Sequence, residues 1–133
     1  KNPTYLQGLD YNISVPEMLL IKAECMARKG DNKCLQVLDQ LRKNRIIAPY
    51  QPLNVPDSKL LETVLQERQR ELPFHGMRFF DMKRLAKEGI YTKTVTRVFK
   101  DQTFTLVPNS NQYLFPIAPK VRSLNSNIVD NPR

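Results

Sequence analysis

Apolar residues recur along this chain with two different periods, and each period predicts a different element of secondary structure. Over residues 32–45 and 58–72, apolar side chains return at the spacing of one face of an α-helix. Over 15–29 the polar residues Glu17, Glu24 and Arg28 recur at helical spacings of seven and four among apolar residues, and a short further helix is expected over 77–87, between Gly76 and Gly89. We therefore predict four helices over these ranges and a mainly α fold.

Short-range signals mark the ends of the first predicted helix. Ser14 and Glu17 have the spacing of a capping box, in which the serine hydroxyl accepts from the Glu17 amide and the Glu17 side chain reaches back to Ser14. Ile13 and Met18 occupy the positions of the hydrophobic staple that accompanies such a box. Gly30 can adopt the left-handed conformation that ends a helix. The first helix is thus bounded on both sides by recognisable signals.

The connector between the first two helices is short, which predicts an antiparallel helical hairpin over residues 14–45. Asp31 directly follows Gly30 and can cap the second helix. This hairpin has the shape of a tetratricopeptide unit, and a single unit cannot bury its own apolar faces. The first helix is apolar around most of its circumference, so we expect it to have neighbours on several sides.

The remaining segments have weaker periodicity. Residues 49–56 contain three prolines and should run extended before the third helix. After Gly89 the period becomes two over 94–99 and 103–107, which predicts a β-hairpin around a turn at 100–102. The tail from Pro108 is rich in Asn, Ser and Pro, so we expect a mostly irregular C-terminal strap. Its predicted anchors are Tyr113, Leu114, Phe115 and Ile117.

Composition places the chain among ordinary globular proteins. It is 41% hydrophobic and 26% charged, and no segment approaches the ~20 unbroken apolar residues of a membrane span. The chain opens at Lys1 with neither an initiator Met nor a signal-peptide pattern. We interpret it as a piece of a longer protein.

The formal net charge of +8 would suit a nucleic acid, because Lys and Arg neutralise phosphates. The basic residues, however, are spread over every segment, and no stretch combines clustered cations with stacking aromatics. We therefore do not expect nucleic-acid binding.

Charged residues of both signs alternate between positions 67 and 84. These are Glu67, Arg68, Glu71, Arg78, Asp81 and Arg84. A catalytic carboxylate pair needs a cleft and shifted pKa values, whereas these carboxylates stand among matched cations. We predict a structural ion-pair motif in which Arg68 or Arg78 is partly buried with Glu71 and Asp81, and we expect no catalytic residue.

Other chemistry-bearing residues are few. His75 is the single histidine, so no histidine-rich metal site or Ser-His-Asp triad is expected. No glycine-rich phosphate-binding loop is present in the sequence, and no cofactor is expected. Cys25 and Cys34 flank Gly30 almost symmetrically and could form a disulfide, but we favour two buried thiols.

The run from Glu67 to Arg84, reading ERQRELPFHGMRFFDMKR, resembles the signature of the SusD/RagB family of lipoproteins. The helical hairpin upstream and the segments 113–117 and 130–132 resemble further parts of that family. The chain departs from the family pattern at His75, where Glu is usual, at Phe79, where Trp is usual, and at Ile117-Ala118-Pro119, which replaces the common Pro-Ile-Pro run.

This resemblance implies that residues 1–133 are the C-terminal part of a single SusD-like domain. Within it, 14–45 would be the tetratricopeptide-like hairpin, 57–88 the signature helices, and 92–133 the β-hairpin and strap. The family implies a non-enzymatic outer-membrane lipoprotein, held by a lipid anchor absent from this chain. Such a protein delivers oligosaccharides or peptides to a TonB-dependent transporter. This region would then be a scaffold that faces the transporter.

A complete glycan site is not expected within these residues. The chain has no Trp, and its five Tyr residues show no spacing of a sugar-stacking platform. The resemblance implies that oligosaccharide is bound through an upstream region, and the ligand-contacting residues remain unassigned. The alternative function is a free-standing tetratricopeptide-type adaptor for a protein partner, which would lack an aromatic-rich region upstream.

Overall fold

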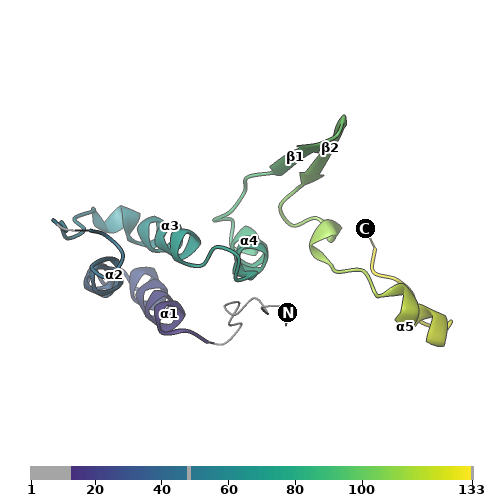
Figure 1. Ribbon diagram of the computed structural model, residues 1–133, viewed down its shortest axis with the longest axis horizontal. Helices are drawn as coiled ribbons and strands as arrows, with labels where there is room; N and C mark the ends of the chain where they lie inside the picture. Colours follow the sequence, from purple (N-terminus) through teal and green to yellow (C-terminus); the bar gives the residue numbers. More distant parts are fainter. Residues whose placement is uncertain (1–12, 48, 133) are drawn as a thin grey trace, which may run out of the picture. The chain divides into compact units, whose positions relative to one another are not determined.

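The structure, a computed structural model, describes residues 13–47 and 49–132, and the chain divides into two compact units, residues 1–78 and 79–133. The first unit contains α1 (Val15–Arg28), α2 (Cys34–Arg42), a 3-10 helix (Asp57–Lys59), α3 (Leu60–Glu71) and the start of α4 (Met77–Lys87) (Figure 1). The second unit continues α4 and holds β1 (Val95–Phe99), β2 (Gln102–Leu106), a 3-10 helix (Asn111–Tyr113) and α5 (Pro119–Leu124). The predicted mainly α fold with a small β-hairpin is confirmed.

Helix α1 begins and ends where the sequence places its boundaries. The Glu17 amide donates to the Ser14 hydroxyl over 3.3 Å, which is the serine half of the predicted capping box. At the other end Gly30 has φ +72°, and the Asp31 amide donates to the Met26 carbonyl over 3.0 Å, which completes a Schellman closure. The predicted hydrophobic staple is wrong, because Ile13 is 79% exposed and cannot pack on the helix.

Helix α2 is shorter than the predicted range 32–45 at both ends. The Asp31 carboxylate accepts from the Lys33 amide over 3.0 Å, so residues 31–33 form a turn before the helix begins at Cys34. Beyond Arg42 the Asn44 amide donates to the carbonyl three residues back, over 3.1 Å, in place of the helical pattern. Local side-chain and turn hydrogen bonds thus replace one helical turn.

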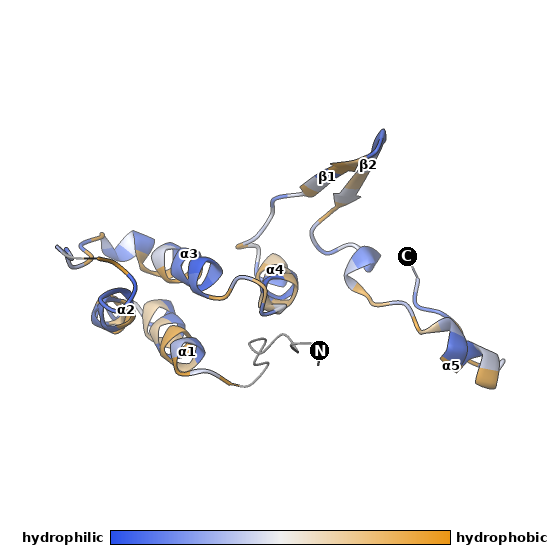
Figure 2. Cartoon of the chain, in the orientation of Figure 1, coloured by the Kyte–Doolittle hydropathy of each residue, from blue (hydrophilic) through white to orange (hydrophobic). Residues whose placement is uncertain are grey.

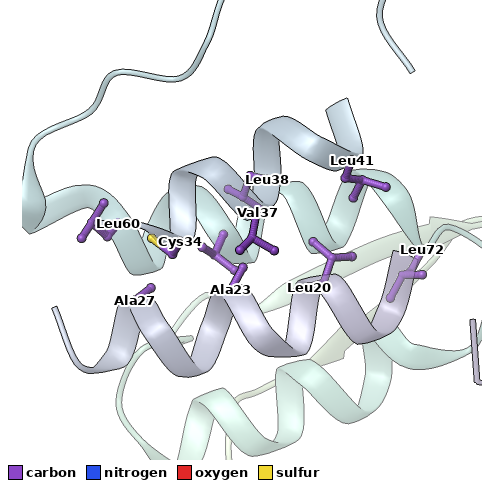
Figure 3. Packing of buried hydrophobic residues seen from close by; sticks show 10 residues of the cluster. Leu20, Ala23, Ala27, Cys34, Val37, Leu38, Leu41, Leu60 and Leu72 are labelled. Atoms are coloured by element: carbon purple, nitrogen blue, oxygen red, sulfur yellow. The ribbon is translucent and has the colours of Figure 1, made fainter. Parts of the chain in front are cut away.

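The core of the first unit lies where α1, α2 and α3 meet, and Figure 3 shows its side chains converging from these helices. The largest side chains that are completely buried are Leu20, Leu38, Leu60, Val64 and Cys34. Each helix presents an apolar stripe to this core and a polar face elsewhere (Figure 2). Helix α3 therefore supplies the cover that a two-helix hairpin lacks.

The extended segment after residue 48 is attached to α2 through Asp39. The Asp39 carboxylate accepts from the Leu53 amide over 3.0 Å and from the Tyr50 hydroxyl. Burial raises the pKa of Tyr50, and the hydrogen bond to Asp39 adds to the rise. Leu53 and Val55 then pack against the core, so this proline-rich segment is ordered by specific contacts.

In the second unit β1 and β2 form a two-stranded antiparallel ribbon. Val95 pairs with Leu106 and Phe99 with Gln102, so the turn comprises Lys100 and Asp101 alone. All residues of the ribbon except Leu106 are exposed, and Figure 2 shows apolar residues along both strands. A ribbon without a covering layer has little stability of its own, and we expect it to pack against further protein.

The C-terminal segment is more regular than predicted. Tyr113 is buried and its carbonyl accepts from Lys83 over 3.2 Å, but the predicted anchor Phe115 is 62% exposed. The expected irregular strap contains α5, which the sequence pattern missed. Its six residues are too few for a helical period, and its N-cap is Ala118, which has no capping side chain.

Asp130 closes the C-terminal segment on itself. Its carboxylate accepts from the Ile117 amide and pairs with Arg122, each over 3.0 Å. The Asn131 side chain donates to the Phe115 carbonyl over 2.7 Å. Residues close to the chain end therefore hold the segment around α5 in place.

The two cysteines are free and differ in environment. Cys34 is completely buried, and burial raises the pKa of its thiol. Cys25 is exposed, so the expectation of two buried thiols is wrong for this residue. The reason is its position on α1, which is opposite to the face that Leu20, Ala23 and Ala27 bury.

We predict that Leu20→Ala lowers the free energy of unfolding by about 2–5 kcal/mol, because it opens a cavity among three helices. Met18→Ala on the same helix is the control. Since Met18 is half exposed, its removal should cost about 0.5 kcal/mol. Urea denaturation followed by circular dichroism compares the two, and equal losses would contradict the described core.

We predict that iodoacetamide modifies Cys25 in the native chain and reaches Cys34 only after unfolding, since a buried thiol with a raised pKa is a poor nucleophile. Peptide mapping by mass spectrometry identifies the labelled residue. Resistance of both thiols to alkylation, together with the mass of a disulfide, would contradict this result.

Candidate functional site

Glu67 on α3 is the most enclosed acidic group of the signature segment, with a residue exposure of 6%. Its carboxylate lies 2.6 Å from the guanidinium of Arg42 on α2 and 3.1 Å from that of Arg70. Burial acts to lower the pKa of Arg42, but the hydrogen bond and charge of Glu67 outweigh it, so the pKa is raised. The Arg42 guanidinium therefore remains charged and is paired with Glu67.

Glu71 repeats this arrangement one turn further along α3. Both of its oxygens accept from Arg45, with the shortest contact at 2.7 Å between Arg45 Nη2 and Glu71 Oε1. This bidentate geometry fixes the orientation of the guanidinium. Arg42 at the end of α2 and Arg45 just after it thus bind two glutamates of α3. These ion pairs join segments that are about 25 residues apart in the chain.

Arg68 lies between these glutamates in sequence but points to a different neighbour. It is 5% exposed, and its guanidinium is 3.8 Å from the carboxylate of Glu17 on α1. The carboxylate of Glu17, which belongs to the predicted capping box, therefore faces Arg68 on α3. In addition to the apolar core, α3 is paired with α2 through Glu67 and with α1 through Arg68.

The last three signature residues lie on α4. Asp81 is buried, and its carboxylate is 2.9 Å from Arg84 one turn along the helix. Arg78 is half-buried. The six predicted residues are thus distributed over α3 and α4, and sequence reasoning did not identify Arg42, Arg45 and Glu17 as partners. The available signal was a pair of arginines three residues apart, Arg42 and Arg45, and a pair of glutamates four residues apart, Glu67 and Glu71, because either spacing places two side chains on one side of a helix.

The signature carboxylates are paired with arginines both between helices and within one helix. The carboxylates of Glu67, Glu71 and Asp81 each lie against an arginine. Within residues 13–47 and 49–132 there is no cluster of three His, Cys, Asp or Glu side chains that could hold a metal ion. Over the same residues, no helix is long and apolar enough to span a bilayer.

A separate pocket of about 280 Å³ lies in the second unit. It lies between α4 and residues 109–114, which include the second 3-10 helix. It is lined by Lys83, Lys87, Asn109, Ser110, Asn111, Tyr113 and Leu114. Asn109 adopts φ +61°, and its side chain donates to the Ala86 carbonyl over 3.1 Å, which holds the segment against α4. Sequence reasoning missed this pocket, although two lysines four apart and the run Asn-Ser-Asn were visible.

An aromatic cluster adjoins this pocket through Tyr113. The ring of Phe79 lies 5.2 Å from Tyr113 and 5.0 Å from Phe115, measured between centroids, and Phe80 lies 5.9 Å from Phe79. Phe80 and Phe115 are each more than half exposed. The second unit therefore presents aromatic faces beside a polar pocket, an association that the scattered tyrosines did not indicate.

A helical hairpin covered by a third helix, followed by a two-stranded ribbon, defines a mainly α protein of tetratricopeptide-like type. The model of the SusD family matches residues 15–133, and the chain belongs to that family. A solved structure described as a SusD-like carbohydrate binding protein from Bacteroides vulgatus ATCC 8482 is similar, with a TM-score of 0.55 and 25% sequence identity. The match covers 87% of this chain and 29% of that structure. No curated protein matches the chain.

We predict that Glu67→Ala lowers the free energy of unfolding by about 3 kcal/mol, because it leaves the partly buried Arg42 without its partner. Glu62→Ala is the matched control on the same helix. Its carboxylate forms an exposed pair with Lys59, so a much smaller loss is expected. Thermal and urea unfolding measure both variants, and similar losses would argue against a structural role for the signature carboxylates.

Proposed function

We propose that this chain is part of a glycan-binding protein that acts in nutrient uptake at the cell surface. The observation that carries the proposal is the SusD-family match over residues 15–133. The similar solved structure, itself described as carbohydrate binding, supports the same ligand class. Tight pairing of the signature carboxylates supports a role in binding without catalysis.

Within that protein this region serves as scaffold, as the C-terminal part of a single SusD-like domain. The chain spans 29% of the length of the similar structure, so most of such a protein lies outside it. Helix α1 exposes Val15, Met18 and Ile21 on the side away from the core. An apolar stripe of this kind suits packing against the remainder of the protein.

The proposed partner is a TonB-dependent outer-membrane transporter of the SusC-like type, which receives the bound oligosaccharide. The proposed location is the outer membrane, where a lipid anchor outside this chain holds the protein. The exposed faces of the tetratricopeptide-like helices would form the docking surface. Family membership favours this function over that of a free-standing tetratricopeptide-type adaptor.

We predict that the 133-residue chain binds neutral oligosaccharides weakly or not at all, whereas the complete protein binds them measurably. The chain has no Trp, and aromatic stacking supplies much of the affinity for neutral, well-hydrated sugars. Isothermal titration of both proteins against a panel of glycans tests this, with light scattering to detect self-association through α1. Tight, saturable binding of a neutral glycan by the monomeric chain would contradict the scaffold assignment.

A further inference from the structure

The residues that line the pocket of the second unit carry positive charge and no negative charge. Two of its lining residues are the lysines Lys83 and Lys87, and the lining residues include no carboxylate. The lysines are four positions apart on α4, so their side chains leave the helix on the same side. Like charges at this spacing repel each other, and an anion held between them would relieve that repulsion.

Neutral hydrogen-bonding groups complete the wall opposite α4. The Ser110 hydroxyl is buried and has no hydrogen-bond partner within the described part of the chain. Asn109 and Asn111 flank it with side-chain amides that can both donate and accept. A buried hydroxyl without a partner carries a desolvation cost, which a ligand with polar groups would remove.

The size and remaining walls of the pocket suit a single sugar ring. Its volume of about 280 Å³ is just below the range of about 300–1,000 Å³ that is typical of small-molecule sites. Tyr113 and Leu114 supply an apolar side, and the exposed rings of Phe80 and Phe115 belong to the cluster that contains Tyr113. Apolar faces beside convergent polar groups are the usual composition of a ligand site.

The geometry points to a subsite for an acidic sugar in the second unit. The carboxylate or sulfate ester of the sugar lies between Lys83 and Lys87, and its hydroxyls meet Asn109, Ser110 and Asn111. This inference rests on the proposed glycan-binding function and narrows its ligand class to anionic glycans. It is compatible with weak binding of neutral oligosaccharides, because the recognition is carried by charge.

The test uses the 133-residue chain and weak-binding probes observed by nuclear magnetic resonance. Glucuronate is titrated against the chain, with glucose as the neutral counterpart and glucose 6-sulfate as the second source of an anion. Saturable shifts of the Asn109 and Asn111 side-chain amides are expected with one or both acids, and glucose should leave them in place. Added salt should weaken the binding.

Two variants locate the site. Lys87→Gln removes one exposed cation of the pocket and should weaken acid binding by roughly fivefold. Lys120→Gln makes the same change on α5, outside the pocket, and should bind as the parent does. Asn111→Ala is a second, exposed variant that should also weaken binding. The same spectra report whether each variant keeps its fold.

Three results would overturn the inference. They are the absence of shifts with both acids, equal shifts with glucose, and equal weakening by Lys87→Gln and Lys120→Gln. Failure of the proposed function is seen separately, as the absence of binding when the complete protein is titrated with the glycan panel. The two titrations therefore distinguish failure of this inference from failure of the proposed function.

Discussion

Burial of one face of α1 is the interaction on which the first unit depends. Leu20 and Ala23 are completely enclosed by α2 and α3, and small side chains at Ala23 and Ala27 allow the helices to approach closely. The extended segment that Asp39 holds beside α2 also packs against this core. Because the buried face takes up one side of α1, its other side remains as an apolar surface.

Charge pairing adds orientation to this apolar core. A buried carboxylate is costly unless it is paired, so Glu67 and Arg42 require a particular placement of α3 beside α2. Arg68 and Glu17 impose a similar requirement between α3 and α1. We propose that the signature segment orients the three helices as they pack, because Glu67 and Arg68 of α3 are paired with residues of α2 and α1.

The second unit is organised differently, around contacts between α4 and the C-terminal segment. Lys83 and Asn109 supply hydrogen bonds between these parts, and Tyr113 is buried with its ring beside that of Phe79. Little apolar surface is covered in the β-ribbon, which remains exposed on both faces. The second unit therefore combines exposed surface with a pocket, while the cluster of buried apolar residues formed by α1, α2 and α3 lies in the first unit. This division fits the proposed roles of the first unit as a scaffold and of the second as a contact for a charged ligand.

The sequence by itself determined the elements whose signals lie within a few residues. The ends of α1, the range of α4, the β-ribbon and the family signature were all predicted, because caps, periods and motifs are local. The partners of Glu67 and Glu71, the exposure of Cys25, and the pocket beside Lys83 were decided by the tertiary structure. Each of these depends on which faces of distant segments meet. That choice is made by packing over the whole unit, and a local pattern does not contain it.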